Sequence, residues 1–376
     1  MFFLGIVKCF VEVPLQYIER AVKSREKEMD PPFLLVKQPG GSSPERPAML
    51  KEDVLNLLSR SESPVSGEEI ARALGVSRAA VNQAVSALRE DGYGIEAATR
   101  KGYRLLSRPD VLTEAEILPL LNENGRRFTL RTFSVIDSTN DWLKAHFREL
   151  PDFTAAIADR QTGGRGRMGR SFVSPPGMGV YLSVLLKPSA PLSDFRCITA
   201  MTAVGAADAV EKACGIRPSV KWPNDLVMNG KKVAGILTEM SLEGETGALQ
   251  YIVAGIGVNV WEKPEDFPEE IRTIAGSLSS QGGTPGRRTE LAATLLNAFG
   301  QIFPDLPAHQ KSSHASYLRD CLNLGKKVLI VRDGSELEAE AIGIDPDFGL
   351  IVRFQDGTEE TVRIGEVSVR GLYGYA

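Results

Sequence analysis

The sequence predicts an α+β protein of several domains: an N-terminal winged helix-turn-helix, a central mixed-sheet domain and a C-terminal SH3-like β-barrel. Three observations support this fold class. Three short amphipathic helical patterns follow one another between residues 49 and 90. Strand-like and helix-like segments then alternate to residue 305, and short strands separated by Asp-Gly turns occupy residues 320–376. A chain of 376 residues has room for two or three such domains.

Composition and charge limit the classes of function. A hydrophobic content of 43% with 24% charged residues is ordinary for a globular protein. The net charge of −4 excludes a uniformly basic nucleic-acid binder, so any DNA contact must come from a local patch. The cysteines show no CxxC spacing, which favours a reducing, cytoplasmic compartment and argues against a structural zinc site; they are Cys9, Cys197, Cys214 and Cys321.

The first 48 residues are expected to form a poorly ordered extension. The apolar stretch Phe2–Val7 is too short to span a bilayer and follows no basic segment, so we expect neither a membrane anchor nor a secretory signal. Residues 37–47, KQPGGSSPERP, have the composition of a linker.

Residues 49–108 are predicted to form a winged helix-turn-helix domain. Ser66 precedes Glu69 by three positions, which is the capping-box signature at the start of a helix. Gly75 supplies a tight turn, and apolar residues in the next segment recur at helical spacing. The helix-turn-helix is therefore expected from Gly67 to Ser86.

The outward face of the second helix of this pair has side chains suited to base edges. They are Arg78, Ala79, Asn82 and Gln83. Recognition helices place their N-terminal residues in the major groove, where Arg, Asn and Gln pair with guanine and adenine. A β-ribbon predicted over Tyr93–Leu105 adds cations for phosphate at Arg100, Lys101 and Arg104. The segment predicts DNA binding, and a small protein-interaction module is the alternative.

Residues 109–319 are predicted to form an α+β domain with a mixed sheet. Asn229-Gly230 is a strong type I′ hairpin signal, and hairpins mixed with helices argue against a regular βαβ array. The expected strands are Thr129–Ile136, Thr154–Ala158, Gly179–Lys187, Ser219–Trp222, Leu226–Met228, Lys232–Glu239 and Tyr251–Val260. The expected helices are Asn140–Leu150, Ile198–Cys214 and Arg288–Phe303.

The segment Gly163–Arg170, GGRGRMGR, is the sharpest functional signal in the chain. Its glycines let backbone N–H groups approach a ligand, and its arginines are donors suited to carboxylate and phosphate. Such a loop can hold an acid and a nucleotide phosphate together while a mixed anhydride forms. The glycines also match GxGxxG, but Ser171–Pro176 follows where a dinucleotide fingerprint needs a helix, so we reject that interpretation.

A second segment, KWPND, ends in Asn224 and Asp225 at the expected mouth of the hairpin. The chain returns through KKVAGIL, which brings Lys232 beside them, where a lysine would neutralise charge building up on an α-phosphate. Gly235 would let a ligand lie against the strand. For Trp222, packing in the core is favoured over stacking on a ligand.

Two further segments combine strand ends with polar groups. The predicted strand over residues 129–136 runs into Asp137–Asn140 (DSTN), in which Ser138 or Thr139 can equally be a plain helix N-cap. AGIGVN at residues 254–259 can also be a buried strand with glycine kinks.

Together these segments resemble the biotin–protein ligase family. The matching motifs are DSTN at 137–140, QTGGRGRMGR at 161–170, KWPNDL at 221–226, KKVAGIL at 231–237 and GIGVN at 255–259. Each motif is weak alone, whereas their order and spacing over the central domain are specific. The resemblance implies the catalytic fold shared with class II aminoacyl-tRNA synthetases. The domains on either side are similar to those of the bifunctional members, which repress biotin genes.

The resemblance implies roles for the matching positions. Those implied to bind biotin are Ser138, Thr139, Asn140, Gln161, Arg165, Gly166, Arg167, Lys232 and Gly235. Those implied to lie near ATP are Lys221, Asn224, Asp225 and Asn259, with Asp225 also a candidate magnesium ligand. Arg165 and Lys232 would be the catalytic residues. Met168 stands where an arginine often appears, and residues 261–277 give no match to the loop that orders over adenine in relatives.

The implied reaction has two steps. The biotin carboxylate attacks the α-phosphate of ATP, in the presence of Mg²⁺, and gives biotinyl-5′-adenylate and pyrophosphate. A lysine of a biotin carboxyl carrier protein then takes the biotinyl group and expels AMP. The other expected partners are operator DNA of biotin genes and, with adenylate bound, a second copy of the chain. The alternatives are a lipoate–protein ligase, a transcription factor that only senses biotin, and a ligase without DNA binding.

Residues 320–376 are expected to form the SH3-like barrel. Its strands are predicted at Lys326–Arg332, Glu336–Ile344, Leu350–Phe354 and Glu359–Val369. A contribution to ATP or carrier binding and a purely structural role are equally open.

Overall fold

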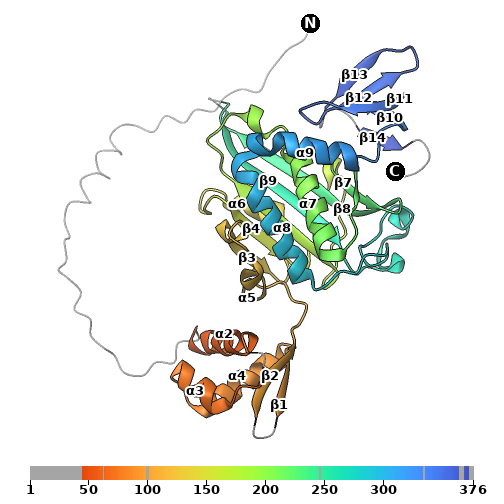
Figure 1. Ribbon diagram of the computed structural model, residues 1–376. Helices are drawn as coiled ribbons and strands as arrows, with labels where there is room; N and C mark the ends of the chain where they lie inside the picture. Colours follow the sequence, from red (N-terminus) through yellow and green to blue (C-terminus); the bar gives the residue numbers. More distant parts are fainter. Residues whose placement is uncertain are drawn as a thin grey trace, which may run out of the picture.

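The structure, a computed structural model, describes residues 45–61, 63–98, 101–244, 247–332, 335–363 and 368–371. A small helical domain, a central domain built on a large sheet and a small second sheet follow one another along the chain (Figure 1). The extension expected over residues 1–48 lies outside the described residues as far as residue 44. The first helix, α2 (Glu45–Ser59), begins before the expected boundary at residue 49. Every helix in the described part of the chain is too short or too polar to traverse a bilayer.

The N-terminal domain is a winged helix-turn-helix. After α2 come α3 (Gly67–Leu74) and α4 (Arg78–Glu90), which share one apolar core with the hairpin of β1 (Gly94–Ala98) and β2 (Gly102–Ser107). The core contains the residues predicted for the inner helix faces, among them the fully buried Ile70. The domain therefore buries its own apolar surface, separately from the core of the central domain.

Local signals at the helix ends act as the sequence predicts. The Ser66 hydroxyl accepts the backbone N–H of Glu69 at 3.1 Å, and the Glu69 carboxylate accepts the N–H of Ser66 at 2.9 Å, which completes the capping box. Gly75 ends α3 with φ of 66°, a left-handed conformation that glycine adopts without steric cost. The turn that separates α3 from α4 is fixed by Gly75 at the end of α3 and by Ser77, whose hydroxyl accepts the N–H of Ala80 at 3.1 Å at the start of α4.

The central domain is built on a seven-stranded mixed sheet in the order β3-β4-β5-β9-β8-β7-β6. β3 and β4 are parallel, and the other neighbours are antiparallel. The strands are β3 (Thr129–Phe133), β4 (Thr154–Ala158), β5 (Gly179–Leu186), β6 (Ser219–Lys221), β7 (Asp225–Met228), β8 (Lys231–Leu242) and β9 (Leu249–Asn259). Asn229 and Gly230 have φ of 48° and 74°, as a type I′ turn between β7 and β8 requires.

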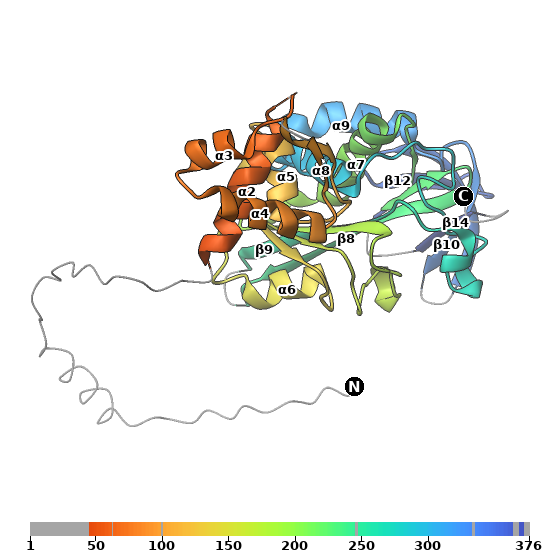
Figure 2. The same ribbon diagram turned by 90° about the horizontal axis from the view of Figure 1, so that it is seen from below.

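Helices cover both faces of this sheet, which Figure 2 shows from the side. α7 (Ile198–Cys214), α8 (Arg288–Ile302) and α9 (Leu306–Asp320) lie on one face, and α6 (Thr139–His146) lies on the other. A short helix, α5 (Glu114–Ile117), precedes the sheet. Because both faces are covered, all the side chains of β4 and β5 are buried. Their sequences are accordingly apolar runs without alternation.

Helix α9 was not predicted from the sequence. Its 15 residues, LPAHQKSSHASYLRD, contain few apolar side chains, and only Leu306, Ser313 and Tyr317 are buried among them. The helix does have a start signal, because the Asp305 carboxylate accepts the N–H of Ala308 at 3.1 Å and Pro307 occupies the first turn. A helix that packs with so narrow an apolar stripe has little periodic signal.

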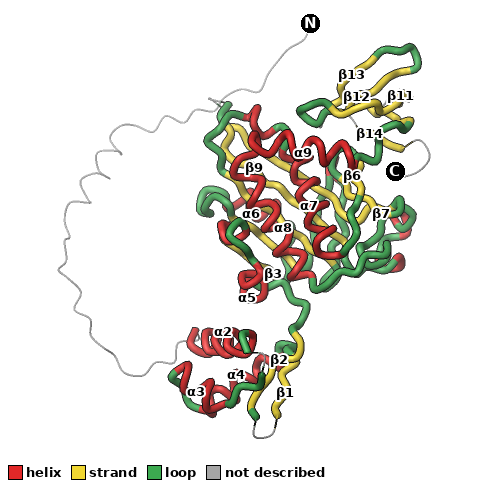
Figure 3. The backbone as a smooth tube through the Cα atoms, viewed as in Figure 1, coloured by secondary structure: helices red, strands yellow, loops and turns green. Residues whose placement is uncertain are grey.

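The C-terminal residues form a small five-stranded antiparallel sheet in the order β13-β12-β11-β10-β14. Its strands are β10 (Lys327–Arg332), β11 (Ser335–Ile344), β12 (Leu350–Phe354), β13 (Glu359–Val362) and β14 (Ser368–Gly371). The prediction of a single strand over Glu359–Val369 is therefore wrong. The segment contains two strands at opposite edges of the sheet, since β13 pairs with β12 and β14 pairs with β10 (Figure 3).

Trp222 joins the two sheets. Its side chain is 1% exposed, and its indole N–H donates to the carbonyl of Phe348 at 2.9 Å. The backbone N–H of Trp222 donates to the side-chain oxygen of Asn323 at 2.7 Å. The prediction that Trp222 packs in the core is confirmed, and the contact also fixes the KWPND turn.

Candidate functional site

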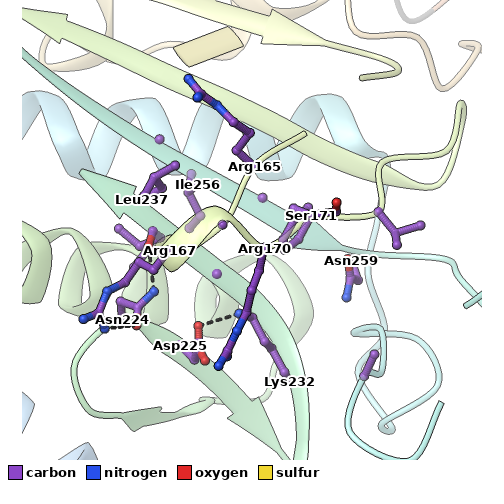
Figure 4. Close-up of a pocket in the computed structure, with 18 of the residues that line it drawn as sticks. Arg165, Arg167, Arg170, Ser171, Asn224, Asp225, Lys232, Leu237, Ile256 and Asn259 are labelled. Carbon is purple, nitrogen blue, oxygen red and sulfur yellow. Dashed lines mark hydrogen bonds and ion pairs between the residues drawn. The ribbon is translucent and has the colours of Figure 1, made fainter. Parts of the chain in front are cut away.

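The predicted motif segments meet at one cavity of about 530 Å³ on the α6 side of the central sheet. Its floor is formed by β8 and β9, and its rim by the N-terminus of α6, the glycine-rich loop and the turn between β6 and β7 (Figure 4). All of the positions that the sequence suggests for biotin and ATP line it: Ser138, Thr139, Asn140, Gln161, Arg165, Gly166, Arg167, Lys221, Asn224, Asp225, Lys232, Gly235 and Asn259.

One end of the cavity is a polar wall formed by Thr139, Asn140, Gln161 and Ser183. The Thr139 backbone N–H donates to Gln161 Oε1 at 2.9 Å, and the hydroxyl oxygens of Thr139 and Ser183 lie 2.6 Å apart. The Ser183 hydroxyl donates to Asn140 Oδ1 at 2.6 Å. Because Thr139, Asn140 and Ser183 are buried, this wall is a fixed set of hydrogen-bonding groups.

Ser138 combines both of the roles that the sequence left open. Its hydroxyl accepts the backbone N–H of Asp141 at 3.3 Å and so caps α6. It also lines the cavity, so the cap and the polar end of the site are built from the same turn.

The arginines of the glycine-rich loop point in different directions (Figure 4). Arg167 donates to Asn224 Oδ1 at 3.1 Å, and Arg170 extends beside Asp225 and Lys232. Arg165 is directed away from that group and pairs with the carboxylate of Asp141 on α6. The basic side of the site is therefore supplied by Arg167 and Arg170 in this arrangement, although the sequence singled out Arg165.

The opposite end of the cavity concentrates positive charge around Asp225. Lys232 Nζ lies 2.6 Å from Asp225 Oδ1, and Arg170 and Lys221 lie close enough to influence one another. Burial lowers the pKa of Lys221 to about 8; the charge of Asp225 opposes this shift, and the charges of Lys232 and Arg170 add to it. An anion such as a phosphate would be stabilised here, because it would relieve the repulsion between these cations.

Lys221→Met is expected to stabilise the folded protein near neutral pH. The folded-state pKa of about 8 lies below the ordinary 10.5, so the unfolded chain binds more protons between these values. The unfolding free energy of the wild type should therefore rise from about pH 8 to about pH 10.5, and the cost of the buried charge is present in full below pH 8. Urea denaturation at several pH values measures the difference between the two proteins. The prediction would be contradicted if the difference in unfolding free energy between wild type and Lys221→Met did not change with pH. It would also be contradicted if Lys212→Met, on the exposed face of α7, gave the same difference.

Two glycines make room for side chains on the floor of the cavity. A Cβ at Gly235 would lie 2.9 Å from Lys232 Nζ, and a Cβ at Gly257 would lie 2.4 Å from the ring of Phe172. Gly235 therefore provides space for the lysine in this structure. A ligand lying against the same strand stays a prediction.

Oxygen ligands for a cation are present, but they do not form a preassembled metal centre. Among the described residues, no three His, Cys, Asp or Glu side chains are grouped to hold a metal ion. Asn259 donates from Nδ2 to the carbonyl of Gly276 at 2.9 Å, while its buried Oδ1 has no hydrogen-bond partner among the described residues. Asp225 and Asn259 both line the cavity and supply oxygen atoms of the kind that Mg²⁺ prefers.

The second candidate site is the exposed face of α4. The four residues predicted to contact bases are all exposed on it: Arg78, Ala79, Asn82 and Gln83. Asn82 Oδ1 accepts the hydroxyl of Tyr103 at 2.5 Å, which ties α4 to the β1–β2 wing. Lys101 and Arg104 are exposed on that wing, whereas Arg100 lies outside the described residues.

Several residues of the site were missed from the sequence. Phe172 lines the cavity just after the glycine-rich loop, and Ser183 is the one serine in the apolar strand GVYLSVLL. The segment after β9 adds an apolar rim at Phe267, Ile271, Ile274 and Ala275. A single polar residue in a buried strand was a usable signal for Ser183; the rim segment has no regular pattern.

Comparisons with known proteins agree with the geometry. Residues 132–259 match the Biotin/lipoate A/B protein ligase family, and residues 51–104 match an HTH domain family. The bifunctional ligase/repressor BirA of Bacillus subtilis is 36% identical over 83% of this chain and 96% of its own length. The bifunctional ligase/repressor BirA of Escherichia coli is 31% identical, over 81% of this chain and 92% of its own length.

Solved structures show the same central fold. A biotin protein ligase from Aquifex aeolicus in complex with biotin and ATP superposes with a TM-score of 0.54. It is 28% identical and covers 65% of this chain and 99% of its own.

Proposed function

This chain belongs to the family of bifunctional biotin ligase–repressors, and we propose that its cavity joins biotin to ATP and then releases the biotinyl group to a carrier lysine. The observation that supports this most strongly is the polarity of the cavity. One end is a neutral wall of hydrogen-bonding groups, and the other is a cluster of cations. Biotin adenylate has matching ends, a ureido ring and an acyl phosphate.

The polar wall favours biotin over lipoate. In our proposal, Ser138, Thr139 and Gln161 bind the ureido ring, and Asn140 supports them from behind. A dithiolane ring has no N–H or C=O group, so it would leave the buried oxygens of this wall without partners. An unsatisfied buried polar group costs roughly 1–3 kcal/mol, which is enough to discriminate between the two acids.

The cationic end would carry out the first chemical step. Lys232 contacts the biotin carboxylate and the α-phosphate, and it neutralises the charge that develops as the carboxylate attacks phosphorus and pyrophosphate leaves. Arg165, Gly166 and Arg167 close over biotin and the adenylate. Lys221 and Asn224 lie along the phosphates.

Asp225 and Asn259 would hold the Mg²⁺ that accompanies ATP, and the ion supplies further neutralisation of phosphate charge. In the second step the carrier lysine attacks the acyl carbon and AMP leaves with the electron pair of the broken anhydride bond. No protein nucleophile is needed, so catalysis consists of positioning and charge stabilisation.

The partners follow from the two sites. A biotin carboxyl carrier protein or domain would present its lysine at the open side of the cavity. Operator DNA of biotin genes would bind α4 and the wing, and the chain would act in the cytoplasm, in keeping with its free cysteines. With adenylate bound, two copies would pair sheet to sheet. Met240 and Leu242 support this pairing, because both are exposed apolar side chains near the end of β8.

Adenylate formation can be tested without any partner. The protein is mixed with biotin and ATP, and pyrophosphate and the retained nucleotide are measured after acid quench. We expect biotinyl-5′-adenylate, no product from lipoate, and loss of the reaction on chelation of Mg²⁺. Light scattering of the same mixture should show the mass of a dimer. Tight biotin binding without pyrophosphate release would favour a sensor-only transcription factor instead.

A further inference from the structure

An ionised group lies directly behind the polar wall, outside the residues that line the cavity. Glu239 on β8 accepts Asn140 Nδ2 at Oε2, 2.8 Å away, and Lys144 Nζ at Oε1, 2.6 Å away. The guanidinium of Arg165 lies 3.8 Å from the same Oε1. Glu239 therefore contacts the wall from behind through Asn140, and it also contacts an arginine of the glycine-rich loop.

The carboxylate decides which way the Asn140 amide faces. A carboxylate can only accept hydrogen bonds, so the NH₂ group of Asn140 must point toward Glu239. The carbonyl of Leu237, 3.3 Å from the same nitrogen, is also an acceptor. Asn140 Oδ1 is thereby turned toward Ser183. It lies against Gly255, where a Cβ would be 2.1 Å from this oxygen, so a larger residue there would displace the amide.

The orientation of the Asn140 amide also decides whether the hydroxyls of Ser183 and Thr139 donate or accept. The Ser183 hydroxyl has a single proton, and it donates that proton to Asn140 Oδ1. In the 2.6 Å contact between the two hydroxyls, Thr139 must therefore be the donor. Thr139 Oγ1 also lies 3.1 Å from Gln161 Oε1, a second acceptor for the same proton. The shorter contact with Ser183 has no other proton to fill it, so we assign the Thr139 proton there, and toward a ligand the Thr139 oxygen is an acceptor.

Gln161 completes the arrangement. Its Oε1 accepts the backbone N–H of Thr139 at 2.9 Å, and its Nε2 donates to Ser174 Oγ at 3.1 Å. The amide is thus fixed with its oxygen beside the Thr139 oxygen. Two neighbouring acceptors then face the cavity, and they match a ring that presents N–H donors.

We propose that Glu239 is a positioning residue that sets the direction of the hydrogen bonds in the polar wall, and through them selects a substrate ring with N–H groups. This inference rests on the proposed function, in which that ring is the ureido ring of biotin. Lys144 binds the other oxygen of this carboxylate, Oε1. Burial opposes the charged amine, but hydrogen bonds to Asp141 and Glu239 raise the pKa of Lys144.

The test compares biotin with the two cyclic carbamates in which one ureido N–H is replaced by oxygen. Pyrophosphate release gives kcat and KM for each acid. Wild type should reject at least one carbamate by about 10-fold or more in kcat/KM, because an acceptor would face the Thr139 oxygen. Glu239→Ala should raise KM for biotin about 10-fold and leave KM for ATP within about twofold. It should also lose the discrimination between biotin and the carbamates, because the hydroxyls of Ser183 and Thr139 can then exchange their donor and acceptor roles.

Lys144→Met is the matched control. It removes an ion pair of Glu239 and leaves the contact with Asn140, so discrimination should stay at the wild-type level. Glu239→Gln has the same size and can turn either face to Asn140, so discrimination should be reduced; it also provides the test if the alanine variant does not fold. The assignment would be overturned if Glu239→Ala and Glu239→Gln discriminate between biotin and the carbamates as well as wild type does. It would also be overturned if Lys144→Met loses this discrimination to the same extent. Failure of wild type to adenylate biotin would instead contradict the proposed function itself.

Discussion

Lys232→Ala is expected to lower the rate of biotin adenylation by about 10²- to 10³-fold, which is the typical cost of removing one group that stabilises transition-state charge. Lys232 is positioned by a 2.6 Å ion pair with Asp225 and lies over Gly235 on the floor of the cavity. Because the negative charge grows as the carboxylate attacks the α-phosphate, the loss should appear mainly in kcat. Pyrophosphate release under saturating biotin and ATP measures it.

Two controls separate this effect from a loss of structure. Lys212→Ala removes an exposed lysine from α7 and should leave kcat within about twofold, as is usual for surface substitutions. The thermal unfolding midpoint of Lys232→Ala should stay near that of the wild type, because the side chain is partly exposed. A rate within about threefold of wild type would remove Lys232 from the chemical step.

The second large effect is expected in DNA binding. Replacing Arg78 and Gln83 together by alanine should weaken operator binding by about 30- to 10⁴-fold, at roughly 1–3 kcal/mol for each lost base contact. Both side chains are exposed on α4. We leave Asn82 unchanged, because it accepts a hydrogen bond from Tyr103 and its loss would also disturb the wing.

Fluorescence anisotropy with a promoter fragment of biotin genes, in the presence of biotin and ATP, measures this affinity at several salt concentrations. Arg72→Ala on α3 is the control, since its exposed side chain lies on the other helix of the motif. It should change affinity little, and adenylation should be unaffected in either variant. Equal binding of the α4 variant and wild type would instead favour the protein-interaction alternative for this domain.

The sequence predicted the elements whose signal is local. The capping box at Ser66, the left-handed Gly75 and the Asn229-Gly230 turn each rest on the chemistry of two or three neighbouring residues. The strand Thr154–Ala158 and the helix Ile198–Cys214 were predicted with their observed ends. A short apolar run is typical of a buried strand and a long one of a buried helix, so the length of each segment indicated its type.

The secondary-structure predictions failed where contacts with residues far apart in the chain determine the structure. α9 is held by a narrow stripe that packs on other elements, so its own periodicity is weak. Residues 359–369 divide into two strands because they pair with β12 and β10 at opposite edges. No local pattern distinguishes this from one continuous strand.

The candidate site shows the same division. The motif residues could be gathered from the order of their segments, and they line one cavity. The direction of Arg165 could not be predicted, because it depends on the carboxylate of Asp141 one helix away. Glu239 could not be singled out either, since its contact with Asn140 joins β8 to α6, which lie far apart in the sequence.

The most direct test of the central claim is ATP-dependent transfer of biotin to a purified biotin carboxyl carrier domain, with lipoate and its own carrier domain as the control. Mass spectrometry of the carrier measures the product. We predict addition of one biotinyl group to the carrier lysine, dependent on ATP, and no lipoyl transfer. An unmodified carrier after incubation with protein that still binds biotin would contradict the ligase function and leave DNA binding as the activity of the chain.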